Sequence, residues 1–305
     1  MGRLASAAAL ALALLLTAGC GGDGGSQTIL ADGSSTVGPF TTRAAENFKE
    51  QSPDVEVTVG ISGTGGGFER FCAGETDLSN ASRPIEDDEE SLCADEGIEY
   101  VELPVANDAL TVVVNPENDW ATCLTVEQLK SIWEPGSKVT SWQDVDATFP
   151  DEPLRLYGPG TDSGTFDYFT DVIVGEEGAS RTDYQASEDD NVIIQGVKGD
   201  KGALGYFGFS YFEQNQDTVK AVAVDNGSGC VAPSVATAQD GTYAPLSRPL
   251  FVYAKKSSLE QPEVAEFLDY MLGNAAEIAE QADFVPLTSA QLAAAKVKLN
   301  AALAT

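Results

Sequence analysis

"YGPGTDSGTFDYF", residues 157–169, places three glycines, a proline and three Ser/Thr hydroxyls directly before an aromatic run. "ADGSSTVGPF" (31–40) and "GISGTGGGFERF" (60–71) follow the same pattern, in which glycine and Ser/Thr precede an apolar helical spacing. A predicted strand stands before each stretch, so each loop leaves the carboxyl end of a strand and enters a helix. Open α/β sheets bind their ligands at this edge.

The rest of the chain alternates the same two patterns. "VEVTVGI" (55–61) has the period of two of a strand, and residues 126–133 have apolar side chains at helical spacing. Further strands are expected at 98–105 and 109–115, and "GALGYFGFSYF" (202–212) is strand-like throughout. The fold class is therefore α/β, and the length favours two domains.

The hydroxyl loops have the chemistry of an anion site. A helix N-terminus carries unpaired N–H groups and a partial positive charge, glycine lets the backbone approach a ligand, and Ser/Thr adds neutral donors. Three such loops together would hold a small tetrahedral oxyanion without a cluster of basic residues.

Enzyme classes lack their usual residues. The chain has no histidine, and its serine loops match neither G-x-S-x-G nor the phosphate-loop pattern. The acidic run 86–90, "EDDEE", is more typical of a solvated face than of a metal site. A structural or adhesive role would leave the three loops unexplained. The sequence thus favours a binding protein that needs neither metal nor cofactor.

The charge narrows the partners. Lys and Arg number 17 against 48 Asp and Glu, a net charge of −31. This argues against nucleic acid and against an anionic membrane surface as partners. Any anion site must act against the field of the whole chain, so it needs strong local donors.

The N-terminus resembles a bacterial lipoprotein signal. Arg3 precedes an apolar run from Leu4 to Leu16, and small residues stand before Cys20. We expect residues 1–19 to be removed, Cys20 to be diacylated, and residues 20–27 to form a flexible tether. The protein would then lie outside the cytoplasm, anchored to the cell membrane.

Four motifs together carry a family resemblance. "DGSSTVGP", "GISGTGGGF", "NASRPI" and "GPGTDSGTFDYF", in that order, resemble the phosphate-binding protein of the bacterial Pst ABC transporter. The resemblance implies a monomer with the two-lobed (type II) periplasmic-binding-protein fold, which closes over phosphate and delivers it to permease subunits. Sulfate or molybdate is the alternative ligand, and a surface-anchored sensory or structural protein is the alternative role.

The resemblance assigns residues by position. It places Thr36 and Val37, beside Ser35, in the first loop and Thr64 in the second, with Ser62 as a fallback. In the third loop it places Ser163, Gly164 and Thr165 against the ligand.

Two positions depart from the family pattern. The usual aspartate of the fourth motif is Ser82 here, and the usual arginine is Pro159. We therefore expect Arg83 to be the only cation of the site, unless it pairs with the acidic run.

A carboxylate that accepts the proton of phosphate would come from Asp108 or Asp162. Asp108 is favoured because Asp162 can be a helix N-cap, although Asp108 can also be a hinge or cap residue.

The resemblance also divides the chain. Residues 28–108 and 249–305 would form lobe 1, and residues 109–248 lobe 2. Cysteines 72, 93, 123 and 230 allow three disulfide pairings, as expected for an exported protein. Cys72–Cys93 with Cys123–Cys230 is favoured, because each bond then lies within one lobe.

Overall fold

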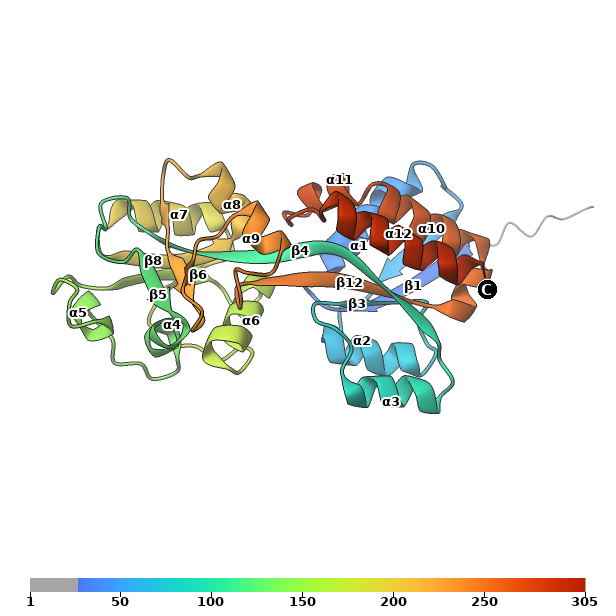
Figure 1. The fold of residues 1–305 in the computed structure, drawn as a ribbon, viewed down its shortest axis with the longest axis horizontal. Coiled ribbons are helices and arrows are strands. Elements are labelled where there is room, and N and C mark those ends of the chain that lie inside the picture. The colour runs from blue at the N-terminus through green and yellow to red at the C-terminus, as the bar shows by residue number, and fades with distance from the viewer. Residues whose placement is uncertain (1–26, 305) are drawn as a thin grey trace, which may run out of the picture.

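The structure is a computed structural model that describes residues 27–304. The predicted signal segment, Cys20 and residues 20–26 of the tether lie outside this range. Figure 1 shows two α/β bodies, here called lobe 1 and lobe 2, with β4 (Tyr100–Val114) and β12 (Ser247–Lys255) running from one into the other. Within residues 27–304, no helix combines the length and the apolar composition that crossing a membrane requires.

Lobe 1 is built on the strand order β2-β1-β3-β12-β4. β1 (Gln27–Gly33) pairs in parallel with β2 (Val55–Val59) and β3 (Leu78–Ala81), while β12 is antiparallel to both of its neighbours. One face is covered by α1 (Gly38–Lys49), α10 (Pro262–Gly273), α11 (Ala275–Gln281) and α12 (Ser289–Leu303). The other carries α2 (Gly63–Cys72) and α3 (Asp87–Asp95), and the 3-10 helix η2 (Lys256–Glu260) follows β12.

Lobe 2 continues the same sheet in the order β4-β8-β6-β7, with β9 (Lys220–Ala221) also paired to β4. Its strands are β8 (Ala203–Gly208), β6 (Arg155–Pro159) and β7 (Gln185–Ser187). A small second sheet joins β11 (Cys230–Val231), β10 (Ala223–Asp225) and β5 (Cys123–Thr125). The helices are α4 (Val126–Trp133), α5 (Trp142–Val145), α6 (Gly164–Phe169) with the π-helix η1 (Thr170–Val174), α7 (Asp190–Gly199), α8 (Phe209–Gln214) and α9 (Val235–Gln239).

The apolar cores are separate. The largest core of lobe 1 takes its buried side chains from residues 29–106 and 250–299, whereas the largest core of lobe 2 takes them from residues 110–246. Both divisions fall within β4 and β12. These two strands are therefore the covalent links between the cores.

One continuous strand replaces the two that the sequence predicted at 98–105 and 109–115. Pro104, which has no N–H to donate, lies inside β4, and the pairing with β12 shifts register between Leu250 and Phe251. This bulge lets Ala106 and Pro104 face consecutive residues of β12. The prediction was also wrong at 209–214, where the aromatic run turns into α8.

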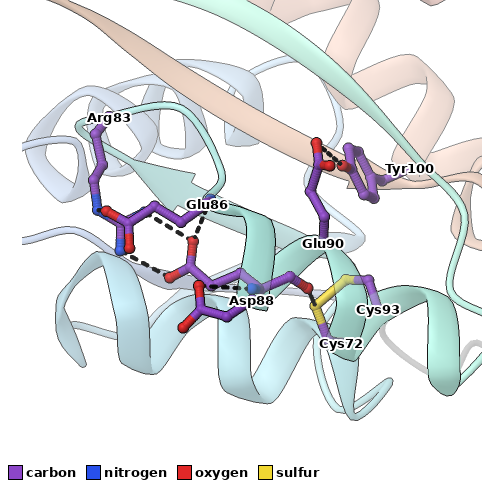
Figure 2. Close-up of a disulfide and its surroundings, with 8 residues drawn as sticks. Cys72, Arg83, Glu86, Asp88, Glu90, Cys93 and Tyr100 are labelled. Atoms are coloured by element: carbon purple, nitrogen blue, oxygen red, sulfur yellow. Dashed lines mark hydrogen bonds and ion pairs between the residues drawn. A yellow bond between two sulfur atoms is a disulfide. The ribbon is translucent and has the colours of Figure 1, made fainter.

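The predicted disulfides are confirmed. Cys72 bonds to Cys93 between α2 and α3, and Cys123 bonds to Cys230 between β5 and β11. Figure 2 shows the first bond between the two helices on the outer face of lobe 1.

Candidate functional site

The first hydroxyl loop is set by close strand packing. Gly33 ends β1 at φ +133°, and a Cβ there would lie 2.2 Å from the backbone oxygen of Asn80 on β3. Glycine is therefore required at this turn. The Ser34 side chain then accepts a hydrogen bond from the N–H of Val37 (3.4 Å), which places Thr36 at the tip of the turn before α1.

The second hydroxyl loop is held from below by a buried carboxylate. Asp32, with 2% of its surface exposed, accepts hydrogen bonds from Ser62 Oγ (2.9 Å) and the Gly33 N–H (2.7 Å). Arg70 of α2 forms an ion pair with the same carboxylate. The Thr64 and Ser82 hydroxyl oxygens lie 3.2 Å apart, so the second loop and the fourth motif meet at one point.

The third loop comes from lobe 2. Ser163 caps α6 by accepting the Thr165 N–H at 3.2 Å. A Cβ placed on Gly164 would lie 3.2 Å from Thr36 Oγ1 of lobe 1. The two lobes therefore contact each other here, and a side chain at 164 would have to push Thr36 aside.

A small cavity lies where the loops converge, with a volume of about 50 Å³. Lobe 1 lines it with Ser34, Ser35, Thr36, Gly63, Thr64 and Ser82. Lobe 2 adds Asp167, Tyr168, Asp171 and Glu177, and β12 adds Arg248. Pockets for drug-sized ligands measure roughly 300–1,000 Å³, so this cavity suits a small ion. Its lobe 1 wall consists almost entirely of hydroxyls.

Arg248 is the cation of this cavity. Its Nη2 donates to Thr36 Oγ1 (3.0 Å), its Nε to Asp108 Oδ2 (3.3 Å), and its guanidinium lies 3.5 Å from the centre of the Tyr168 ring. Within residues 27–304, Nη1 has no hydrogen-bond partner. Three contacts hold the guanidinium, and one donor edge is left for a ligand.

Sequence reasoning did not single out Arg248. It lies directly opposite Asp108 in the antiparallel pairing of β12 with β4, although the two are 140 residues apart. No local motif marks it. The one available signal is an arginine next to a crossing segment that had already been predicted.

Arg83, the expected cation, lies elsewhere. Its Nη1 and Nη2 each bond a Glu89 carboxylate oxygen at 2.8 Å, and its Nε lies 3.2 Å from Glu86. Figure 2 shows the side chain turned toward the acidic start of α3. The arrangement is the alternative in which Arg83 pairs with the acidic run. Because Arg248 lines the cavity, the expectation of Arg83 as its only cation is wrong for this geometry.

The two candidate carboxylates differ in position. Asp108 is 7% exposed, and burial raises the pKa of its carboxyl while the charge of Arg248 opposes the rise. It faces a second cavity of about 190 Å³, together with Ser35, Thr36, Gly164 and Thr165. Asp162 is exposed and lines neither cavity.

The structure thus divides the predicted residues. Ser35, Thr36, Thr64 and Ser82 line the first cavity, and Asp108, Gly164 and Thr165 line the second, which shares Ser35 and Thr36. Ser163 stands one residue before Gly164, and Val37 is fully buried in the lobe 1 core.

Acidic residues of lobe 2 were missed as well. Asp167 faces the first cavity, and burial and the charge of Glu177 raise the pKa of its carboxyl, against the opposing charge of Arg248.

Comparison with known proteins agrees with this geometry. A family model described as "PBP superfamily domain" matches residues 19–275. The phosphate-binding protein PstS of Staphylococcus saprophyticus is 40% identical over 296 residues, which cover 94% of this chain and 91% of that protein. The chain belongs to the PstS family of the PBP superfamily. The predicted periplasmic-binding-protein fold is thereby confirmed.

Two further PstS-family comparisons extend over most of the chain. Protein SphX of Synechocystis sp. is 48% identical over 294 residues, covering 95% of this chain and 88% of SphX. A solved structure titled "a possible phosphate binding protein" from Planctomyces limnophilus superposes with a TM-score of 0.88 at 46% identity, covering 91% of this chain and 99% of that one. The likeness therefore includes both lobes.

Proposed function

We propose that this PstS-family protein binds inorganic phosphate between its lobes, outside the cytoplasm, and passes it to the permease of an ABC transporter. It is a binding protein and not an enzyme. The observation that carries the proposal is Arg248, which lies in a small hydroxyl-lined cavity with one donor edge unpaired. The names of the relatives at 36–48% identity support phosphate as the ligand.

The local donors answer the problem set by the charge of the chain. A net charge of −31 repels an anion at long range, but salt screens that repulsion beyond about 10 Å. Inside the cavity, a fixed guanidinium and freely rotating hydroxyls act at contact distance. Thr64 and Ser82 bond each other without a ligand, and either hydroxyl can rotate to donate to a phosphate oxygen.

We propose that residues 28–108 with 249–305, and residues 109–248, move as the two lobes. Hinge motion in β4 and β12 would open the contact between Gly164 and Thr36 and admit the ligand. Arg248 lies on one of these strands, so the loops of both lobes would close onto a cation that stays near the hinge.

Calorimetric titration with phosphate, sulfate and molybdate tests the function. We expect one-to-one binding of phosphate, with sulfate and molybdate weaker. Preference for sulfate or molybdate would assign the chain to another oxyanion. Absence of binding to all three would favour the surface-anchored sensory or structural role.

We further propose that Cys20 carries the lipid anchor and that residues 20–26 act as a tether. Mass spectrometry of the membrane-bound protein should find a diacylated Cys20 as the first residue. An intact Met1 in that fraction would contradict the proposal.

A further inference from the structure

The second cavity lies beside the phosphate site and also separates the lobes. Pro39 and Asp283 line it from lobe 1, and Asp190 and Tyr211 line it from lobe 2. Asp108 lies at the crossing between them. In the described chain, no lysine or arginine lines this cavity. Its only charged side chains are thus three carboxylates, and Asp108 alone among them has an arginine as a partner.

Asp190 is the carboxylate that lobe 2 presents. It begins α7, and its side chain accepts a hydrogen bond from the Gly208 N–H at the start of α8. Burial raises the pKa of this carboxyl to about 6, and the charges of Asp189, Asp283 and Glu188 add to the rise, against the Gly208 bond. The carboxyl therefore loses its proton well above the usual range for aspartate.

The groups that face Asp190 divide by lobe. Asp189 and Glu188 precede it on its own segment, and Tyr211 of α8 feels the charges of both Asp190 and Asp283, which raise the pKa of its hydroxyl. These neighbours belong to lobe 2 and move with Asp190. Asp283 belongs to lobe 1, directly after α11, and can approach Asp190 only when the lobes meet.

We propose, on the basis of the proposed phosphate function, that Asp190 takes up a proton when the lobes close, so that phosphate affinity rises as the medium becomes acidic. Closure places Asp190 in a cavity without a cation and brings the negative charge of Asp283 toward it. Both effects disfavour the ionised form of the carboxyl. In the open form the cavity is divided, and water solvates the carboxylate.

The sign follows from the two protonation states. The open form has a pKa near the ordinary aspartate value of 3.8, and the closed form has about 6. Between these values the closed form holds a proton that the open form has lost, so closure is favoured by acid. As the pH rises through 6, closure must bury a charge instead. Between pH 7 and pH 5 this coupling tightens phosphate binding by up to about tenfold.

The test compares Asp190→Asn with the parent protein by phosphate titration at pH 5 and pH 7, each in two buffers of different ionisation enthalpy. Asparagine keeps an oxygen for the Gly208 N–H and carries no charge at either pH. We expect Asp190→Asn to bind phosphate more tightly than the parent at pH 7. At pH 5 the parent should take up close to one more proton per phosphate than the variant. Protonation of phosphate itself cancels in this difference.

Asp217→Asn is the matched control, because it removes the same charge from an exposed position of lobe 2. It should bind as the parent does at both pH values. Equal tightening by both variants would overturn the proposal in favour of general electrostatics. Unchanged proton uptake in Asp190→Asn would overturn it as well.

Asp283→Asn provides a second route if Asp190→Asn does not fold. Asp283 has φ +61°, a conformation that asparagine also adopts readily, so this variant should be tolerated. It should tighten binding at pH 7 in the same direction, with a smaller amplitude. A parent that binds phosphate with no such change refutes the proton coupling alone, whereas a parent that binds no phosphate refutes the proposed function.

Discussion

Removing Arg248 should weaken phosphate binding more than removing any other cation of the chain. Its Nε and Nη2 are occupied by Asp108 and Thr36, which leaves Nη1 for the ligand. One charge-assisted hydrogen bond contributes roughly 1.5–3 kcal/mol. Since each 1.4 kcal/mol is about tenfold in affinity, Arg248→Ala should raise the Kd by about 10- to 150-fold.

A second effect acts in the same direction. Without Arg248, the Asp108 carboxyl stays buried beside the anion and loses the charge that opposes its raised pKa. The lower end of the range is therefore the firmer estimate. Arg248→Lys keeps the charge but loses the planar fork, so it should lie between the parent and Arg248→Ala.

Isothermal titration calorimetry gives the affinities, and Arg83→Ala is the matched control. Arg83 pairs with Glu89 and Glu86, so its loss should change the Kd by less than about twofold, as expected for a partly exposed ion pair. Breaking a buried ion pair costs about 3–5 kcal/mol of stability, so thermal unfolding must first show that Arg248→Ala is folded at the titration temperature. Equal losses in Arg248→Ala and Arg83→Ala, or a loss below threefold in Arg248→Ala, would refute this account of the site.

Three further predictions concern selectivity, stability and motion. Asp108→Asn should weaken phosphate while improving the relative binding of sulfate, and the exposed Asp162→Asn should change the ratio less; titrations in which both variants keep the parent ratio would exclude a carboxylate as the sorting group. Replacing both Cys123 and Cys230 by serine should lower the free energy of unfolding by about 5 kcal/mol, against about 3 kcal/mol for Cys72 and Cys93, because the loops differ in length; denaturant unfolding that ranks the pairs the other way would contradict the loop-entropy argument. Small-angle scattering should show a smaller radius of gyration with phosphate, and an unchanged radius would argue against lobe closure.

The parts of the fold that depend on local pattern could be predicted from sequence. The strand–loop–helix order of the first three motifs, the α/β class and both disulfides follow from residues close together in the chain, or from cysteines assigned to one lobe. The union of 98–105 and 109–115 into one strand could not, because Pro104 interrupts the pattern and only the bulge in β12 accommodates it.

The site was predictable in its hydroxyls and less so in its charges. Thr36, Thr64 and Ser82 stand in motifs that a reader can recognise. Arg248 comes to the cavity through strand register, and a pairing across 140 residues leaves no local mark. Arg83 was misread because its neighbours in sequence could not show that Glu89 lies within 2.8 Å of it.

The bulged pairing of β4 with β12 has a consequence for engineering. Ala109 and Ser247, at the two ends of the segment that forms lobe 2, are partners in that pairing. Antiparallel partners have Cα atoms about 4.5–5.5 Å apart, so the two junctions of this segment are neighbours in space. Lobe 2 is therefore an insertion whose ends meet, and such a segment can be exchanged with that of a relative without changing the distance its host must span. A chimera cut at these two residues would keep Asp108 and Arg248 in the host, and would transplant only the third hydroxyl loop and the acidic wall that faces them.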